Sequence, residues 1–193
     1  MARLKTNSIR IIGGHHRGQK FPFPDVSGLR PTSDRIRETL FNWISPVIAG
    51  ARCLDLFAGS GALAFEALSR GASEVIMVEQ SSVAVRQLRT NLGLFKTDQS
   101  SIVQADALSY LDSITKPFDI IFLDPPFAQD VLQRCIDTIN RLHLFNEQTQ
   151  IYLEAPKNAT LPKLPDGWQW YRNKTAGNVG YHLIHCYQSG SDQ

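Results

Sequence analysis

The chain has 193 residues, of which 42% are hydrophobic and 20% are charged, and its formal net charge is +2. These values are ordinary for one globular domain with a sizeable core. Neither the start of the chain nor any later run is apolar enough for a signal peptide or a membrane span, which predicts a cytoplasmic protein. Cys53, Cys135 and Cys186 are odd in number and far apart, so we expect reduced thiols rather than disulfides or zinc ligands.

The chain begins with a basic arm. Residues 1–37 hold eight Lys or Arg and two acids, an excess of six positive charges, so the remaining residues carry an excess of four negative charges. Within the arm, "SIRII" (8–12) and "QKFPF" (19–23) have strand character and flank "GGHHRG" (13–18), which predicts a β-hairpin with a basic turn. Such an arm on an acidic body favours a polyanionic partner, although most charged runs are simply solvated.

A helix is expected next, and strands and helices then alternate. Thr32 or Ser33 can cap the first helix, and apolar residues follow at helical spacing, namely Ile36, Leu40, Phe41 and Ile44. The expected strands are 52–57, 74–79, 101–105, 118–123 and 150–154. The expected helices are 61–70, 81–94 and 129–142, with a short one near 107–114. This alternation predicts an α/β fold, in which a mainly parallel sheet is covered by helices on both faces.

The C-terminal tail predicts two further strands. The segment 168–188 has strand character on both sides of "TAGNVG" (175–180), which predicts a closing antiparallel hairpin. His182 and His185 are three residues apart on one of these strands, so they face opposite sides, and we expect no metal site there. An open sheet of this kind binds its ligand at the carboxyl ends of its strands.

A glycine-rich turn follows the first strand of the sheet. Gly59 and Gly61 allow a tight turn and a close approach of ligand to backbone, and Glu79 ends the next strand 20 residues after Gly59. An acid at that distance typically binds ribose hydroxyls. The pattern with Ala64 also fits a relaxed dinucleotide fingerprint. A nicotinamide cofactor, S-adenosylmethionine and a purely structural turn therefore all remain open at this point.

Two further acids favour S-adenosylmethionine. Asp55 lies at the end of the first strand, where it can face the cationic amino-acid end of that cofactor, whereas a pyrophosphate would be repelled. Asp106 ends the third strand within reach of an adenine amino group. Asp106 is equally well explained as the N-cap of the helix that follows it.

The tetrapeptide "DPPF" ends the fourth strand. A carboxylate at Asp124 and the carbonyl of Pro125 can both accept hydrogen bonds from a planar amino group. They would hold its nitrogen toward a methyl donor and favour the positive charge that develops on it. Pro126 offers no N–H that would compete, and Phe127 can stack on a base. An isolated Asp-Pro-Pro is usually a helix cap and turn, so the position after the fourth strand decides the interpretation.

Several segments resemble one enzyme family. These are "RIIGG" (10–14), "RG" (17–18), "LRPTSDRIRETLFNWI" (29–44), "FAGSGALAFEALSRGA" (57–72) and "DPPF" (124–127). They resemble the RsmD family, which comprises class I methyltransferases that use S-adenosylmethionine to methylate guanine N2 in bacterial 16S ribosomal RNA. The resemblance implies a Rossmann-like, seven-stranded sheet with an antiparallel C-terminal hairpin and a small N-terminal β-hairpin extension. "DPPF" alone also occurs in adenine-N6 DNA methyltransferases.

The resemblance extends to site residues. Cofactor contacts are expected from Thr32, Asp55, Phe57, Ala58, Gly59, Ser60, Gly61, Glu79, Gln80, Asp106, Ala107 and Asp124. Catalysis is expected at Asp124, Pro125, Pro126 and Phe127. RNA contacts are expected from Arg10, His15, His16, Arg17, Lys20, Arg30 and Arg35, although Arg35 and Arg37 could instead pair with Asp34 or Glu38. The target guanine would lie in a loop or be flipped out of a helix.

The expected organisation is one domain over 1–193, in which 1–28 form the RNA-contacting hairpin and 29–193 form the catalytic core. The partner implied by the resemblance is 16S ribosomal RNA within the small subunit or its assembly intermediate. The implied activity is of the guanine-966 N2 type, in a monomer without a metal. The alternatives are methylation of adenine N6 and a non-catalytic RNA-binding protein that retains the fold.

Overall fold

The computed structural model describes residues 7–25, 31–95, 97–98, 100–126 and 129–187. The strands of its large sheet are β3 (Arg52–Asp55), β4 (Glu74–Glu79), β5 (Ser101–Gln104), β6 (Phe118–Leu123), β7 (Phe145–Pro156), β8 (Trp168–Ala176) and β9 (Val179–Cys186). The helices are α1 (Asp34–Trp43), α2 (Ala62–Ser69), α3 (Ser82–Leu92), α4 (Ala107–Leu111) and α5 (Gln129–Arg141), with a 3₁₀ turn η1 (Gly93–Phe95). A separate hairpin consists of β1 (Asn7–Arg10) and β2 (Lys20–Phe23).

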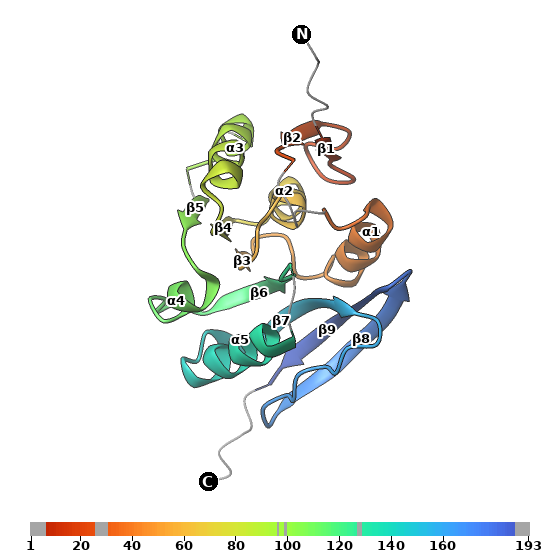
Figure 1. Ribbon diagram of the computed structural model, residues 1–193, viewed down its shortest axis with the longest axis vertical. Coiled ribbons are helices and arrows are strands. Elements are labelled where there is room, and N and C mark those ends of the chain that lie inside the picture. Colours follow the sequence, from red (N-terminus) through yellow and green to blue (C-terminus); the bar gives the residue numbers. More distant parts are fainter. Residues whose placement is uncertain (1–6, 26–30, 96, 99, 127–128, 188–193) are drawn as a thin grey trace.

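The strand order of the large sheet is β5-β4-β3-β6-β7-β9-β8 (Figure 1). The strands from β5 to β7 are parallel, whereas β9 is antiparallel to both β7 and β8. This arrangement confirms the expected Rossmann-like class I fold with its C-terminal hairpin. The chain leaves β3 first toward β4 and β5 and later returns to β6 on its other side. The switch in strand order therefore opens a crevice at the carboxyl ends of β3 and β6.

The sequence located every element of the sheet but misplaced some boundaries. The expected strand 150–154 is too short, since β7 begins at Phe145 and its pairing with β6 shifts register between Phe118 and Ile120. In the irregular stretch, the Asn146 side chain accepts the Gln148 N–H. Because these residues are polar, the sequence pattern did not indicate that the strand begins before residue 150. The expected helix 107–114 ends at Leu111, and the expected helix 81–94 divides into α3 and η1.

Two apolar cores lie on the two faces of the sheet. The hairpin, α1, α2 and Leu88 of α3 contribute to one core, and α4 and α5 contribute to the other. Fully buried aromatic side chains such as Phe41, Phe65 and Phe122 occupy the first core. Each such side chain stabilises the fold by roughly 1.5–3 kcal/mol relative to leaving it exposed. The N-cap of α1 is Ser33, whose side chain accepts the Ile36 N–H.

The N-terminal hairpin is present as expected and is part of the first core. Ile9, Phe21 and Phe23 are buried in it. The carboxylate of Glu66, which is fully buried on α2, accepts the backbone N–H groups of Ile12 and Gly13, each at 2.8 Å. These contacts hold the hairpin against α2. The expected division at residue 28 lies in 26–30, outside the described residues, so the domain division stays a prediction.

The three cysteines are free and buried. Burial raises the pKa of the Cys135 thiol to about 12, and it raises the pKa values of Cys53 and Cys186 further. These thiols are therefore held in their neutral, unreactive form. Within the described part of the chain, none of the helices has the length and apolar character that a membrane crossing requires.

Candidate active site

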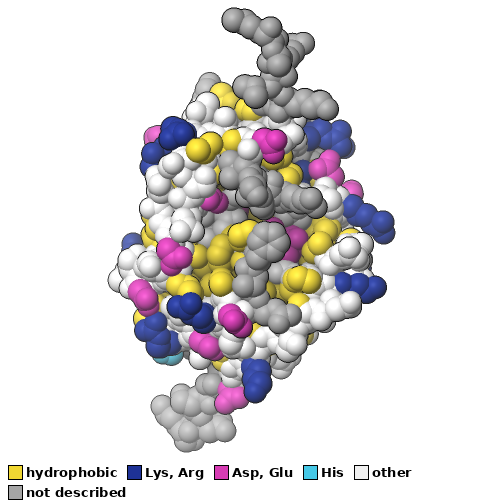
Figure 2. All heavy atoms as spheres, viewed as in Figure 1, with side chains coloured by type: hydrophobic (Ala, Val, Ile, Leu, Met, Phe, Trp, Pro, Cys, Tyr) yellow, Lys and Arg dark blue, Asp and Glu magenta, His cyan; other side chains and the backbone are white. Residues whose placement is uncertain are grey.

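A cavity of about 1310 Å³ opens at the carboxyl edge of the sheet. Its walls come from the ends of β3, β4, β5 and β6 and the loops that follow them, from Glu154 of β7, from α5, from the segment before α1, and from the tip of the β8–β9 hairpin. In Figure 2, hydrophobic side chains gather in the middle of the face shown, acidic side chains lie among and around them, and Lys and Arg lie toward the periphery. Pockets for one small ligand measure roughly 300–1,000 Å³, so this cavity has room for a cofactor and a second group.

The predicted cofactor residues converge on this cavity. Those that line it are Thr32, Asp55, Phe57, Ala58, Gly59, Ser60, Glu79, Gln80, Asp106, Ala107 and Asp124. Gly61 is not among the lining residues. It has a left-handed backbone with φ of 80°, and an added Cβ would lie 2.4 Å from Phe65 and 2.8 Å from Leu88. Gly61 therefore allows the close packing of α2 against α3, rather than contacting a ligand directly.

Glu79 holds the glycine turn in place. Its Oε2 accepts the Gly59 N–H at 2.9 Å and its Oε1 accepts the Ser81 N–H at 2.7 Å. The turn itself needs glycine, since Gly59 has φ of 52°. The same carboxylate lines the cavity with lone pairs to spare, and those are the acceptors that ribose hydroxyls require.

Asp55 is a buried carboxylate without enough partners. The residue is 2% exposed, and its Oδ1 has no hydrogen-bond partner among the residues that the structure describes. Burial raises the pKa of Asp55 to about 7, and backbone N–H groups of Phe57 and Ala64 only partly offset this. An unpaired buried carboxylate that faces a cavity is a site for a cationic group. The predicted contact with a cationic amino-acid end stays a prediction.

Asp124 lies at the carboxyl end of β6 and faces the cavity with Pro125 and Pro126. Its Oδ2 accepts the Thr32 hydroxyl at 3.2 Å. Burial raises the pKa of Asp124 well above its ordinary value, and the neighbouring carboxylates of Glu154 and Asp55 raise it further. Phe127, the predicted stacking residue, lies outside the described residues.

One of the two roles expected for Asp106 is observed. It is the N-cap of α4, and its Oδ1 accepts the Ser109 N–H at 3.0 Å. It also lines the cavity at the end of β5. The Ser109 backbone and hydroxyl hydrogen bonds lower the pKa of Asp106, with a smaller contribution from Arg134. The capping is therefore observed, whereas a contact with adenine stays a prediction.

Sequence reasoning missed Glu154, Tyr152 and Arg134. Glu154 lies near the end of β7, is 8% exposed and lines the cavity. Its Oε1 accepts the hydroxyl of the fully buried Tyr152 at 2.7 Å. Arg134 of α5 contributes a cation to the cavity wall beside Asp106. The available signal was the segment "YLEAP", an acid at the end of a buried strand before a proline.

The predicted RNA-contacting residues are divided between two places. Arg10, Arg17 and Lys20 are exposed on the hairpin, and Arg35 is exposed on the first turn of α1. Arg10 pairs with Asp34 at 3.4 Å, which brings it beside the start of α1.

The two histidines of the hairpin turn lie further from the cavity. The backbone N–H groups of His15 and His16 bind Ser69 at the C-terminal end of α2, whereas the cavity lies at its N-terminal end. Arg30 lies outside the described residues. Arg37 is buried, 1% exposed, and pairs with Asp34 at 2.7 Å, which is the alternative role weighed for it.

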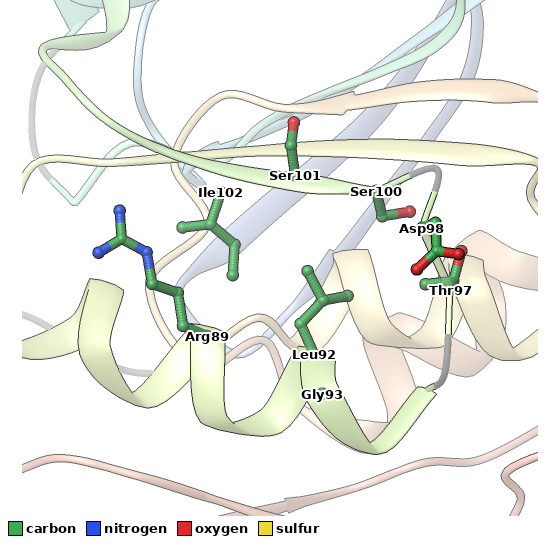
Figure 3. Close-up of a pocket in the computed structure, with 8 residues that line it drawn as sticks. All are labelled: Arg89, Leu92, Gly93, Thr97, Asp98, Ser100, Ser101 and Ile102. Atoms are coloured by element: carbon green, nitrogen blue, oxygen red, sulfur yellow. The ribbon is translucent and has the colours of Figure 1, made fainter.

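A second, smaller cavity of about 350 Å³ lies between the C-terminal half of α3 and the start of β5. Figure 3 shows Arg89 and Leu92 of the helix extending toward the strand, from which Ile102 points toward the helix. It contains none of the predicted site residues and lies at the opposite, amino edge of the sheet. Among the residues that the structure describes, His, Cys, Asp and Glu form no group suited to a metal ion.

Comparison with known proteins identifies close relatives of the chain. A model of the family described as conserved hypothetical protein 95 matches residues 9–185. The protein named ribosomal RNA small subunit methyltransferase D of Escherichia coli (strain K12) is 44% identical, and the match covers 92% of this chain and 90% of the relative. The Haemophilus influenzae protein of the same name is 40% identical, with 91% and 92% covered. The solved structure of yhhF from Escherichia coli has a TM-score of 0.88 at 40% identity, covering 95% of this chain and 100% of that one.

Proposed function

This chain belongs to the RsmD family of methyltransferases, and on that premise we propose that it methylates the exocyclic N2 of a guanine in 16S ribosomal RNA with S-adenosylmethionine as the methyl donor. The observation that carries the proposal is the convergence of Asp55, Glu79 and Asp124 on one cavity at the switch in strand order. Membership of the family supports ribosomal RNA as the substrate and methyl transfer as the reaction. The choice of guanine N2 rests on the resemblance and on the chemistry of the site.

The residues of the cavity fit S-adenosylmethionine. Its sulfonium supplies an activated methyl group, and the molecule carries positive charge at both the sulfonium and the ammonium. Asp55 would hold the ammonium through its unpaired Oδ1, and Glu79 would accept hydrogen bonds from the ribose. Asp106 would accept one from the adenine amino group. A cavity rich in carboxylates suits such a cation and disfavours a pyrophosphate, which argues against a nicotinamide cofactor.

Asp124 would orient the amino group that accepts the methyl group. The lone pair of an exocyclic amine is delocalised into the base, which makes the nitrogen a weak nucleophile. The Asp124 carboxylate and the Pro125 carbonyl can accept both N–H bonds and so favour the positive charge that develops on the nitrogen during transfer. The Thr32 hydroxyl, bound to Asp124 Oδ2, fixes the orientation of the carboxylate. The surplus proton then leaves through Asp124.

The RNA would approach across the basic face of the hairpin. Arg10, Arg17, Lys20 and Arg35 are exposed cations that can bind phosphates and position the RNA without reading its sequence. The target base must leave any helix to reach the cavity. We propose that the chain acts as a monomer in the cytoplasm on the small subunit or its assembly intermediate, because this hairpin presents a limited surface to free RNA.

The proposal is tested by methyl transfer from radiolabelled S-adenosylmethionine to small subunits isolated from cells that lack the enzyme. Free ribosomal RNA, DNA and bulk protein are assayed in parallel, and the labelled nucleoside is identified by mass. The expected product is N2-methylguanosine in 16S ribosomal RNA. Label in N6-methyladenine or in protein would overturn the substrate, and cofactor binding without any transfer would identify a non-catalytic RNA-binding protein.

A further inference from the structure

Asp124 and Glu154 form a pair of carboxylates on neighbouring strands. The strands β6 and β7 are parallel, and Leu123 pairs with Leu153, so Asp124, the residue directly after β6, follows the same register as Glu154 of β7. Adjacent strands lie about 4.8 Å apart and side chains at matching positions point to the same face. Both residues line the cavity. The proposed mechanism uses Asp124 but leaves Glu154 without a role.

The order of strands places Glu154 on the substrate side of Asp124. Asp55 of β3 pairs with Phe122 of β6, so Asp55, Asp124 and Glu154 project from the same face of three adjacent strands. Asp55 is the member of this row nearest the expected cofactor, because β4 and the glycine turn lie on its side of the sheet. A base whose amino group reaches Asp124 therefore has its neighbouring atoms beside Glu154.

The Tyr152 hydroxyl holds Glu154 as a hydrogen-bond acceptor. The Tyr152 hydroxyl donates to its Oε1 at 2.7 Å, and the Thr32 hydroxyl lies within hydrogen-bonding reach of the same side chain. Burial raises the pKa of Glu154, and these two hydrogen bonds act in the opposite direction. A carboxylate that already accepts one hydroxyl proton has further lone pairs that can accept hydrogen bonds from a ligand.

We propose that Glu154 is the residue that selects guanine, by accepting the N1–H of the target base while Asp124 and Pro125 hold its N2 amino group. This inference rests on the proposed function. Guanine presents N1–H and the N2 amino group as adjacent donors on one edge, which matches two adjacent carboxylates. Adenine presents an amino group beside an unprotonated N1, whose lone pair would face Glu154. A buried acceptor left opposite a lone pair discriminates strongly between the two bases.

The test replaces the target guanine by 2-aminopurine, which keeps the 2-amino group but has an unprotonated N1. Once the methylated position has been mapped, RNA carrying either base there is reconstituted into small subunits. The wild-type protein is expected to methylate the guanine subunits with a kcat/KM at least about 100-fold higher than the 2-aminopurine subunits. Glu154→Gln offers an amide N–H to the unprotonated N1, so its preference should shrink to less than about tenfold.

Two other variants complete the comparison. Glu147→Gln makes the same chemical change at an exposed position of β7 and should keep the wild-type preference. Tyr152→Phe removes one donor to Glu154 and should reduce the preference by a smaller factor, with the side-chain volume preserved. The affinity of each variant for S-adenosylmethionine should stay within about threefold of wild type, because β6 separates β7 from the strand that carries Asp55.

A binding measurement without turnover separates recognition from catalysis. With S-adenosylhomocysteine present, wild type should bind guanine subunits more tightly than 2-aminopurine subunits, and Glu154→Gln should lose this difference. If folded Glu154→Gln keeps the wild-type preference in both assays, the role assigned to Glu154 is wrong while the proposed function stands. If the wild-type protein transfers no methyl group to guanine subunits, the proposed function itself fails.

Discussion

Glu79 Oε2 accepts the backbone N–H of Gly59 at 2.9 Å, which ties the end of β4 to the turn after β3. The two residues are 20 positions apart in sequence and meet because β3 and β4 are adjacent parallel strands. The carboxylate thereby shapes the glycine turn. Glu79 has two functions in this account, since it orders the turn and offers acceptors to the ribose.

Glu79→Gln should therefore weaken both the cofactor site and the fold. The single oxygen of Gln can accept only one of the two backbone N–H groups that Glu79 accepts. The NH₂ group of Gln faces the other backbone N–H, which therefore loses its acceptor. We expect the Kd for S-adenosylmethionine to rise at least about tenfold, together with a loss of stability of about 1–3 kcal/mol. Calorimetric titration and thermal unfolding measure the two effects. Glu74→Gln, at the other end of β4, is the matched control and should leave the Kd unchanged.

The buried Asp55 predicts that the ligand-free protein is less stable at high pH. Burial raises the pKa of Asp55 from 3.8 to about 7, so between these values the native state binds more protons than the unfolded state. Stability contributed by this group therefore falls as pH rises from about 4 to about 7. Asp55→Asn should be more stable than wild type at pH 8, by a few kcal/mol at about 1.4 kcal/mol per unit of pKa shift. Urea unfolding at pH 5 and pH 8 provides the comparison, and an equal difference at both pH values would contradict the assignment.

The same titration predicts pH-dependent cofactor binding. A cationic ligand binds the ionised carboxylate, so the affinity of wild type for S-adenosylmethionine should rise as pH increases from 6 to 7.5, with release of a proton. Calorimetry in buffers of different ionisation enthalpy would detect that proton. In Asp55→Asn the affinity should be low and nearly independent of pH in this range, because the titrating group is absent. A wild-type affinity that does not change with pH would count against this role of Asp55.

The part of the site that sequence could predict is the part encoded by local pattern. Gly59, Glu79 and Asp124 each follow a short apolar run, and the rule that ligands bind at the carboxyl edge of a parallel sheet brings them together. Glu154 could not be found in this way. Its position opposite Asp124 depends on the register between β6 and β7. The pairing around Asn146 is irregular, so the sequence pattern did not predict where β7 begins. Register is a tertiary property that a single strand does not encode.

The N-terminal hairpin shows a second limit of sequence reasoning. The pattern predicted both strands and the turn, but the turn "GGHHRG" (13–18) was interpreted by its charge alone. In the structure, Gly13 and Gly14 dock on the end of α2, where Ser69 donates its hydroxyl to the Gly13 carbonyl at 2.6 Å. Gly13 and Gly14 allow the turn to pack closely against α2. This contact places His15 and His16 away from the cavity.

Gly14→Ala should test that docking, with Gly18→Ala as the matched control. Both glycines have positive φ values, of 74° and 86°, so each substitution incurs backbone strain of roughly 1–2 kcal/mol. Only at Gly14 would the added Cβ collide, at 1.8 Å from the Ser69 carbonyl oxygen, whereas no atom of the described residues lies within 4 Å at Gly18. The free energy of unfolding, measured in urea, should fall by at least about 2 kcal/mol more for Gly14→Ala than for Gly18→Ala. Gly14→Ala should also increase hydrogen exchange in β1 and β2. Equal effects of the two substitutions would show that the hairpin is not held there.

Neutralising the exposed cations of the hairpin should weaken RNA binding but not cofactor binding. In the triple variant with Gln at Arg10, Arg17 and Lys20, the slope of log K against log salt should decrease in magnitude by up to about three, close to one per lost phosphate contact. Filter binding to small subunits at several salt concentrations measures the slope.

The control for that experiment is a triple Gln variant at Lys116, Arg141 and Lys163, which are exposed elsewhere. Its salt slope should match wild type, because these three cations are not expected to touch phosphate. If the hairpin variant lost S-adenosylmethionine affinity in parallel with RNA affinity, the arm would have a structural role instead.

The most direct test of the account is the single-turnover rate of methyl transfer by Asp124→Ala on undermethylated small subunits. Asp124 is assigned to hold the reacting amino group, so its removal should slow the chemical step at least about 100-fold. The Kd for S-adenosylmethionine should rise by a much smaller factor than the rate falls, since Asp55 and Glu79 remain. An Asp124→Ala protein that transfers the methyl group at the wild-type rate would contradict the mechanism.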